Sequence, residues 1–393
     1  MNKKLRIAIF SDTFVPDING VAVSTFNLWT SLRARGHYVV VVTSNPYSRK
    51  VTLKDDVLRI PGIEMKKLFG YHFAPPSRRA YKILKKLNID VVHVQSEAGM
   101  GMFGKWFARL RRLPYVYTYH TMYEDYTHYV TKGKMDPFAK SIIRHFSRWQ
   151  AESASEFISP SDKTKIALRE YGVYRYVNVI PTGIDFTKFA ATKESLAFAE
   201  EYKAKHGLNQ TFNLVYVGRV AKEKSIDVLL EGYAKYVENT PNHATKFVIV
   251  GGGPAIPELE KHALKLGIKE IVHFVGRVEP DEIGAYYYLG DVFVSASLSE
   301  TQGLTYMEAM AAERILLCRF DEGLVNVIKD EETGFFFKDE KDFGERFTLV
   351  RSLSKAEKQD VINAASAIVD YYSNEKFSER SEEVYYRAIR NSW

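Results

Sequence analysis

Cysteine is almost absent from this sequence, since Cys318 is the single one among 393 residues. One thiol cannot form a disulfide within the chain, which excludes the disulfide-stapled secreted folds and fits a reducing compartment. Cys318 ends the apolar run Ile315-Leu316-Leu317. We therefore expect it to be a buried structural thiol rather than a reactive one.

Long apolar runs are missing as well. No stretch approaches the about 18 consecutive apolar residues that would indicate a membrane-spanning helix. The start of the chain does not resemble a signal peptide, because Lys3, Lys4 and Arg6 are followed by only a short apolar segment, residues 7–10. We expect a cytoplasmic protein, or one held peripherally on the inner face of the cell membrane.

Metal-binding patterns are a third absence. The sequence has no pair of cysteines, no HxxxH helix pattern and no DxD-like pair of carboxylates in a loop after a predicted strand. These absences predict that the protein requires no metal ion, and we expect that it requires no cofactor. Low-complexity segments and internal repeats are also absent, which excludes solenoid architectures.

Charge is present in abundance but is unevenly distributed. Residues 1–190 carry 30 Lys and Arg against 15 Asp and Glu, whereas residues 191–393 carry 25 against 33. The basic half would attract an anionic partner, such as nucleic acid, an acidic lipid leaflet or a phosphorylated ligand. Solvated surface charge is the simpler interpretation of any one of these cations.

Strand-like and helix-like segments alternate along both halves, which predicts an α/β protein with two parallel, doubly wound, Rossmann-like sheets facing across a cleft. The segment Pro181-Thr182-Gly183-Ile184-Asp185 interrupts this pattern and marks the boundary. We predict an N-terminal domain over residues 1–184 plus about 374–393, and a C-terminal domain over 185–373. Residues 370–393 have a helical pattern.

The C-terminal half carries two glycine-containing loops, each between a predicted strand and a predicted helix. In the first, Gly218 clears space while Arg219 and Lys224 offer cations that can bind phosphate oxygens. The second is Gly251-Gly252-Gly253-Pro254, in which Gly253 and its neighbours permit close backbone approach and Pro254 suits a first helical turn. Both loops are predicted to contact a nucleotide diphosphate, although the cations could instead be solvated.

A third loop joins the segment 291–295 to a helix and contains Glu300, Gly303, Leu304 and Glu308. Amide groups at such a helix start can bind phosphate, and the two carboxylates can accept hydrogen bonds from sugar and ribose hydroxyls. A helix-capping Glu and a Glu at the edge of the core would give the same pattern.

Two features of the N-terminal half fall at predicted strand ends. Gly20 lies in the loop 16–24 that opens the first helix, where backbone amides attract phosphate. His120 follows the strand that begins at Tyr115, and could bind a sugar hydroxyl near the reacting centre; a buried, hydrogen-bonded His is the alternative. His93 and Glu97 are weaker candidates at a similar strand end.

Taken together, these motifs resemble glycosyltransferase family 4, which are retaining nucleotide-sugar transferases with the two-domain GT-B fold. The resemblance implies that Arg219 and Lys224 hold the donor diphosphate, that Glu300 contacts the sugar and that Glu308 contacts the ribose. It places His120 near the donor sugar and the acceptor, and it makes the last helix cross back onto the N-terminal domain. Thr182 and Ser225 depart from the Asn and Gly that the family commonly has there.

Within the family, residues 119–129 and 180–185 resemble bacterial 1,2-diacylglycerol 3-alpha-glucosyltransferases. The resemblance implies transfer of glucose from UDP-glucose to the 3-hydroxyl of diacylglycerol, with the α-configuration retained. Basic and aromatic residues interleave over residues 66–149, which fits a lipid acceptor on an anionic membrane. No recognised nucleic-acid module accompanies them, so we expect no nucleic-acid partner.

Three alternatives remain open at the level of the sequence. The acceptor could be another glycolipid, a polyprenyl lipid or a soluble molecule. A UDP-sugar epimerase of the same fold would need no acceptor, and a membrane sensor of sugar nucleotides would need no catalysis, although the retained Arg219, Lys224, Glu300 and Glu308 argue against a sensor.

Overall fold

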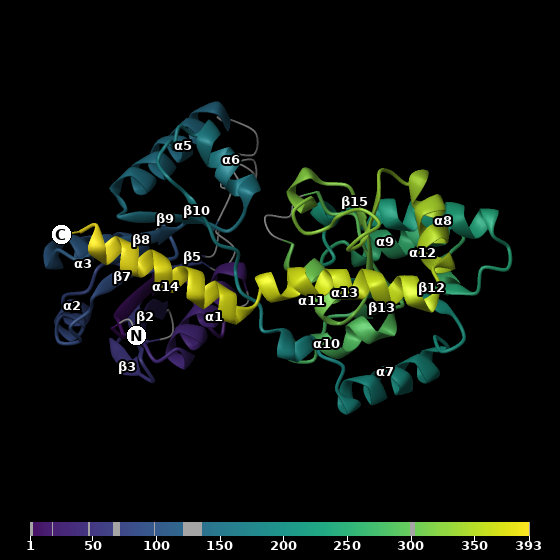
Figure 1. The fold of residues 1–393 in the computed structure, drawn as a ribbon, viewed down its shortest axis with the longest axis horizontal. Helices are drawn as coiled ribbons and strands as arrows, with labels where there is room; N and C mark the ends of the chain where they lie inside the picture. Colours follow the sequence, from purple (N-terminus) through teal and green to yellow (C-terminus); the bar gives the residue numbers. More distant parts are fainter. Residues whose placement is uncertain are drawn as a thin grey trace. The chain divides into compact units, whose positions relative to one another are not determined.

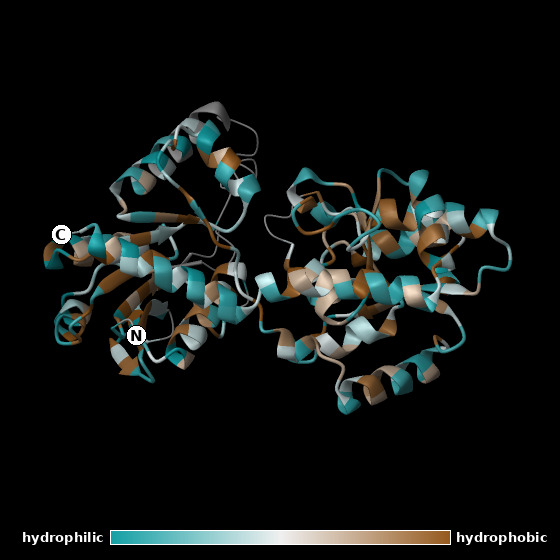
Figure 2. Cartoon of the chain, in the orientation of Figure 1, coloured by the Kyte–Doolittle hydropathy of each residue, from teal (hydrophilic) through white to brown (hydrophobic). Residues whose placement is uncertain are grey.

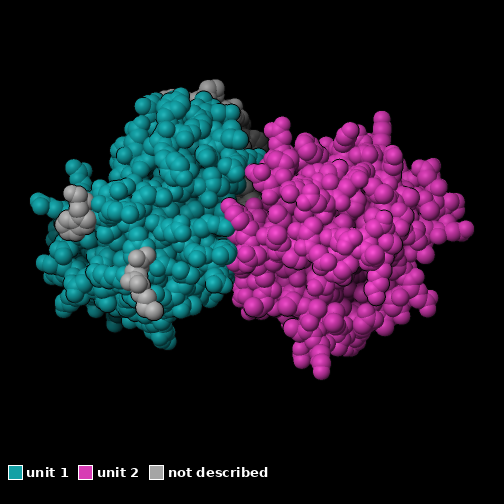
Figure 3. Space-filling view, viewed as in Figure 1, with its two compact units in different colours: residues 1–183, 374–393 teal, residues 184–373 magenta. Residues whose placement is uncertain are grey.

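The computed structural model describes residues 3–17, 19–45, 48–65, 71–97, 99–120, 136–298 and 303–392. The chain divides into two compact units, drawn in different colours in Figure 3. Unit 1 comprises residues 1–183 and 374–393, and unit 2 comprises residues 184–373. This division falls one residue from the domain boundary that the sequence predicted.

Unit 1 is built on a sheet in the order β10-β9-β8-β7-β1-β2-β4-β3, in which only β3 runs antiparallel to its neighbour. Its strands are β1 (Arg6–Ser11), β2 (Tyr38–Asn45), β3 (Thr52–Lys54), β4 (Val57–Pro61), β7 (Val91–Val94), β8 (Tyr115–Thr118), β9 (Glu156–Ser159) and β10 (Asn178–Val179). A separate hairpin pairs β5 (Ile63–Met65) with β6 (Tyr71–Phe73). The helices are α1 (Gly20–Ala34), α2 (Arg78–Lys85), α3 (Gly99–Arg111), α5 (Asp136–Ser153), α6 (Asp162–Glu170) and α14 (Asn374–Arg390).

Both faces of this sheet are covered, as expected for parallel strands that are apolar on both sides. Alternate residues of one strand belong to different cores: Ala8 and Phe10 pack with α2, α3, α5 and α6, whereas Ile7 and Ile9 pack with α1 and α14. Figure 1 shows α14 lying along unit 1 beside α1. The prediction that the last helix returns to the N-terminal domain is therefore confirmed.

Unit 2 has a six-stranded parallel sheet in the order β13-β12-β11-β14-β15-β16. Its strands are β11 (Phe212–Val217), β12 (Thr245–Val250), β13 (Val272–Gly276), β14 (Val292–Ser295), β15 (Ile315–Arg319) and β16 (Phe335–Phe337). Its α-helices are α7 (Lys193–His206), α8 (Ile226–Asn239), α9 (Ile256–Lys265), α10 (Ile283–Tyr286), α11 (Leu304–Ala311), α12 (Asp342–Ser352) and α13 (Lys355–Tyr371). Short 3-10 turns are η1 (Phe186–Phe189), η2 (Lys222–Lys224), η3 (Lys269–Ile271), η4 (Tyr287–Leu289) and η5 (Glu322–Leu324).

The core of unit 2 also lies on both sides of its sheet. Leu214 and Tyr216 pack with α8, α9 and α12, while Val215 and Val217 pack with α7, α10 and α11. Figure 2 shows the same arrangement as hydrophobic strands within more hydrophilic helices. Cys318 is buried in β15, as predicted, and burial raises the pKa of its thiol.

The chain passes between the units twice, at neighbouring points. Ile184 forms an isolated parallel bridge with Ser373, and the Ile184 amide donates to the Tyr372 carbonyl oxygen at 3.0 Å. On the unit 1 side, the side-chain amide of Asn27 donates to the Gly183 carbonyl oxygen at 2.7 Å. Thr182, which stands where the family commonly has Asn, is buried and donates to Ser24 Oγ at 3.2 Å.

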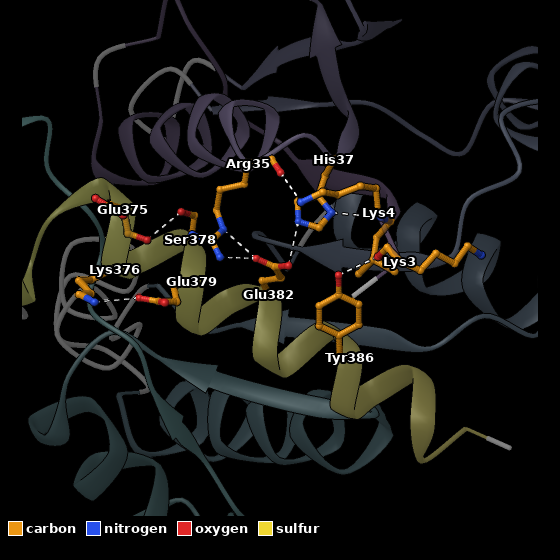
Figure 4. Close-up of polar contacts among 11 residues, drawn as sticks. Lys3, Lys4, Arg35, His37, Glu375, Lys376, Ser378, Glu379, Glu382 and Tyr386 are labelled. Carbon is orange, nitrogen blue, oxygen red and sulfur yellow. Dashed lines mark hydrogen bonds and ion pairs between the residues drawn. The ribbon is translucent and has the colours of Figure 1, made fainter. Parts of the chain in front are cut away.

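Polar contacts fix the α14 helix on unit 1 (Figure 4). Glu382 accepts from Arg35 at 2.7 Å and lies 3.3 Å from His37 Nε2, while the Tyr386 hydroxyl donates to the Lys3 carbonyl oxygen. Further along the helix, Arg387 pairs with Glu156 at 2.8 Å. A run of buried apolar side chains lies beneath these contacts: Phe377, Val384, Tyr385 and Ala388.

Some details differ from the sequence-based expectations. The short strands β3, β5, β6 and β16 were not predicted, since three-residue segments give too little periodicity, and the five-residue strand β4 was missed as well. The predicted helical stretch 370–393 is interrupted, because α13 ends at Tyr371 and α14 begins at Asn374. None of the described helices is both long and apolar enough to span a membrane.

Candidate active site

The strand order of unit 2 reverses between β11 and β14, where successive connections go to opposite sides. Ligands of open parallel sheets bind beside the carboxyl ends of the strands at such a reversal. The loop after β11 begins at Gly218, and the segment after β14 leads to α11. Both segments were predicted to contact the donor, and the topology brings their starting points to adjacent strands.

Two glycine loops of unit 2 pack tightly against each other. The Gly218 amide donates to the Val250 carbonyl oxygen at 3.0 Å, and the Val220 amide donates to the Gly252 carbonyl oxygen at 2.9 Å. A Cβ atom on Gly251 would lie 1.8 Å from the Gly218 carbonyl oxygen, and one on Gly253 would lie 2.0 Å from that of Val220. Glycine is therefore required at both positions by packing alone.

The cationic residues of the first loop lie around η2. Arg219 is exposed, and its guanidinium forms an ion pair with Glu223. Lys224 is half-buried, and Ser225 after it has φ 49° and ψ 42°, in the left-handed region that glycine adopts easily. The family's common glycine at this position thus corresponds to a backbone conformation that this chain adopts with a serine.

The α11 segment contains the described part of the third loop. Gly303 caps α11 with φ 68°, and a Cβ there would lie 2.5 Å from Tyr306 Cδ2, so glycine is required. Leu304 begins the helix, and Glu308 accepts a hydrogen bond from the Tyr287 hydroxyl at 2.7 Å. Burial raises the pKa of Glu308, and the Tyr287 hydrogen bond opposes this effect. Glu300 lies outside the described residues.

In unit 1 the strand order reverses between β1 and β7, and the predicted residues follow these strands and β8. Gly20 is the first residue of α1, as predicted, and the Asn19 side chain before it accepts from the Ala22 amide. A Cβ atom on Gly20 would meet no atom within 4 Å. Packing within the described residues therefore does not require glycine there.

His120 follows β8 and belongs to a hydrogen-bonded group. Its Nε2 donates to Gln95 Oε1, and the Gln95 amide nitrogen lies 3.3 and 3.2 Å from the two ring nitrogens of His93. His93 contacts the Tyr385 hydroxyl at 2.6 Å and the Thr118 hydroxyl at 2.7 Å. Burial lowers the pKa of His120 to about 4 and that of His93 to about 3, so both imidazoles are neutral at pH 7.

The structure corrects one expectation and adds residues that the sequence analysis missed. Pro254 precedes α9 rather than lying in its first turn, where Pro257 stands instead. Glu97 is buried and accepts from the Tyr117 hydroxyl at 2.5 Å. Glu223 could have been predicted as a partner from its i,i+4 spacing to Arg219, whereas Tyr287, Gln95 and Tyr385 meet their partners through the fold alone.

Across the described ranges, no three His, Cys, Asp or Glu side chains gather in a way that could hold an ion.

Comparison with known proteins identifies the family. Residues 18–188 match the sequence model of Glycosyltransferase Family 4, and residues 198–367 match that of Glycosyl transferases group 1. The alpha-monoglucosyldiacylglycerol synthase of Acholeplasma laidlawii is 35% identical over 356 residues, covering 88% of each chain. The enzyme with the same name from Streptococcus pneumoniae is 33% identical over 342 residues, covering 86% of this chain and 76% of its own.

Solved structures share the fold at lower sequence identity. HepE from Anabaena, in complex with UDP, superposes with a TM-score of 0.72 and 14% identity over 97% of this chain and 99% of its own. HepE has also been solved with UDP-glucose. The two sheets, the returning α14 helix and these matches agree, and the chain is a hexosyltransferase that belongs to glycosyltransferase family 4 and has the GT-B fold.

Proposed function

We propose that this enzyme transfers a hexose, with glucose as the first candidate, from a UDP-sugar to a lipid acceptor with retained α-configuration. The proposed acceptor is the 3-hydroxyl of 1,2-diacylglycerol, presented at the cytoplasmic face of the cell membrane. The observation that carries the proposal is that this chain is similar, over most of its length, to two alpha-monoglucosyldiacylglycerol synthases. UDP and UDP-glucose in complexes of HepE, which shares the fold, support the choice of donor.

We assign the donor nucleotide to unit 2. In this assignment Arg219 and Lys224 hold the diphosphate, together with the backbone at Gly218, Gly253, Gly303 and Leu304. Glu308 accepts from the ribose hydroxyls, and its hydrogen bond from Tyr287 orients the carboxylate. The ion pair with Glu223 fixes the guanidinium of Arg219 near the strand end, where a diphosphate can compete for it.

Negative charge develops on the departing UDP in the transition state, and the enzyme has to stabilise it. Cations and helix-start amides can stabilise this charge as the glycosidic bond loosens. We assign this role to Arg219 and Lys224 without a metal ion, so EDTA is expected to leave the rate unchanged. In unit 1, we place His120 beside the donor sugar with Gly20 nearby, and Glu300 is assigned to the sugar hydroxyls by the family resemblance alone.

Membrane contact is supported by the surface of unit 1. Met102, Trp106 and Leu110 recur every four residues along α3 and are 55%, 41% and 51% exposed, so they form one apolar stripe, which we call the α3 stripe. Trp149, also exposed, lies beside it on α5 with Lys105 Nζ 3.0 Å from its ring centre.

The helix that carries this stripe and the helix α2, whose Tyr81 packs on Trp106, are rich in cations. Arg109, Arg111 and Arg112 come from α3 and its end, and further cations come from α2: Arg78, Arg79, Lys82 and Lys85. Exposed apolar side chains on helices that also carry cations fit an anionic lipid surface, where each cation near the surface contributes about 1 kcal/mol.

A transfer assay tests the proposed reaction. Purified enzyme receives radiolabelled UDP-glucose, UDP-galactose or UDP-N-acetylglucosamine, with or without diacylglycerol in anionic vesicles. We expect label in the organic phase only with UDP-glucose and diacylglycerol, and loss of most of it with Arg219→Ala. Label that stays in nucleotide sugars as an epimer would support the epimerase instead, and an unchanged donor would support a sensor.

Vesicle sedimentation tests the membrane surface separately. Leu110→Ser is expected to weaken binding to anionic vesicles without changing the thermal stability, because Leu110 is exposed. Leu264→Ser, at an exposed leucine on α9 of unit 2, is the matched control and should bind as the unaltered enzyme does. Equal binding by both variants would contradict the assignment of the α3 stripe to the membrane.

A further inference from the structure

A group of polar side chains connects α14 to His120 through the interior of unit 1. His93, in β7, contacts Tyr385 from α14 on one ring nitrogen and Thr118 from β8 on the other. Gln95, just after β7, lies between His93 and His120. His93, Gln95 and Tyr385 are each at most 1% exposed, so water cannot replace these contacts.

The contact with Gln95 decides which nitrogen of His120 carries the proton. A carbonyl oxygen can only accept, so Gln95 Oε1 binds the form of His120 that is protonated on Nε2. Burial lowers the pKa of His120 to about 4, so the ring is neutral at pH 7 and Nδ1 keeps its lone pair. In this form Nδ1 can accept a hydrogen bond from a hydroxyl group but cannot donate one.

The orientation of Gln95 is in turn fixed by its neighbours. A side-chain amide can rotate by half a turn and exchange its donor for its acceptor. The Gln95 amide nitrogen lies 3.3 and 3.2 Å from the two ring nitrogens of His93, and the unprotonated nitrogen of this neutral ring can accept a hydrogen bond from it. His93 and Gln95 are buried and His120 is partly buried, so an amide nitrogen of Gln95 that lost its contact with His93 would be a buried donor without that partner, which costs about 1–3 kcal/mol.

We propose that Gln95 is a positioning residue that holds His120 in the Nε2-protonated form, and that Tyr385 of the C-terminal helix maintains Gln95 through His93. The proposal rests on the proposed function in one respect, the place of His120 beside the donor sugar. There, the Nδ1 lone pair would accept from a hydroxyl of the sugar or the acceptor. The C-terminal helix thereby determines the hydrogen-bonding character of His120 through two intervening side chains, His93 and Gln95.

The tautomer can be measured without any activity. Nitrogen-15 NMR of the ten histidine rings, with His120→Gln used to assign its signals, separates Nε2-protonated from Nδ1-protonated imidazole. The unaltered protein should show His120 protonated on Nε2 at pH 7. Gln95→Leu should give a mixture of the two forms, and Gln95→Glu should keep the Nε2 proton while raising the pKa of His120 by about one to three units.

Kinetics with UDP-glucose and diacylglycerol vesicles supply the second measurement. Gln95→Leu should lower kcat by up to about 100-fold, with a far smaller change in KM for the donor. Gln95→Glu should retain more activity at pH 8 than at pH 6. Gln210→Leu and Gln210→Glu, at an exposed glutamine between α7 and β11, are the matched controls and should behave as the unaltered enzyme.

Two tyrosines of α14 test the remote part of the proposal. Tyr385→Phe removes the hydroxyl that contacts His93, whereas Tyr386→Phe removes one that donates to the Lys3 carbonyl oxygen. Only Tyr385→Phe should alter the tautomer of His120 and lower kcat. A His120 ring protonated on Nδ1 in the unaltered protein, or the same tautomer after Gln95→Leu, would overturn the proposal. If the enzyme transfers no glucose, the proposed function fails, and the NMR measurement still decides the role of Gln95.

Discussion

Acidification from pH 7 to pH 5 is expected to lower the free energy of unfolding of unit 1, with His93 contributing about 2 kcal/mol. Burial lowers the pKa of His93 to about 3 in the folded protein, against 6.5 for the free side chain. At pH 5 the unfolded chain therefore binds a proton that the folded protein does not. Each pH unit below 6.5 then costs about 1.4 kcal/mol, and the loss continues until the pH approaches 3.

Other histidines of unit 1 act in the same direction. Burial lowers the pKa of His37, although Glu382 opposes this effect, and lowers that of His120 to about 4. The total decrease should therefore exceed the contribution of His93 alone.

Tryptophan fluorescence can follow this effect in unit 1 alone, because Trp29, Trp106, Trp149 and Trp393 all belong to it. Urea unfolding at pH 7, 6 and 5 would be compared between the unaltered protein and His93→Asn. At pH 7, His93→Asn is expected to have a lower free energy of unfolding than the unaltered protein. Between pH 7 and pH 5, that free energy should decrease by about 2 kcal/mol less in the variant. Equal losses in both proteins, or an NMR titration of His93 with a midpoint above pH 5, would refute the reasoning.

Three further predictions concern single side chains. Gly253→Ala should weaken UDP binding in calorimetry and lower the melting temperature, because its Cβ would lie 2.0 Å from the Val220 carbonyl oxygen; Gly344→Ala, with 3.6 Å to its nearest neighbour, should not. Ser225→Gly should stabilise unit 2 by about 0.5 kcal/mol in urea unfolding followed by circular dichroism, because φ 49° strains a residue with a side chain; a destabilised variant would contradict this. Glu382→Gln should cost unit 1 about 1 kcal/mol by removing the carboxylate that pairs with Arg35, whereas Glu379→Gln, which breaks an exposed pair with Lys376, should cost almost nothing; equal costs would show that burial is irrelevant here.

The main features of the fold could be predicted from the sequence because they depend on local patterns. Runs such as 39–42 and 214–217 are apolar at successive positions, as strands covered on both faces must be, and glycine or proline separates them from helices. The two parallel sheets and the family assignment were confirmed. The boundary near 184 followed from Pro181 and Gly183, which interrupt the pattern.

The arrangement of the candidate site was only partly accessible from the sequence. Gly218 and Gly303 could be placed at strand and helix ends, but the sequence does not reveal that Tyr287 orients Glu308 or that Tyr385 reaches His93. These pairs are 21 and 292 residues apart and meet only because of the packing. The roles of Arg219, Lys224 and His120 in catalysis remain predictions, and Glu300 lies outside the described residues.

The division of unit 1 between the two ends of the chain has a consequence for biosynthesis. Unit 2 is one continuous segment, so a ribosome releases everything it needs before the last helix emerges. Unit 1 cannot complete its core until α14 has been translated, because Val384, Tyr385 and Ala388 pack in the same core as Leu5 and Ile7. A chain truncated before Asn374 would expose that apolar face to chaperones and proteases, so unit 1 is finished only after α14 has been translated.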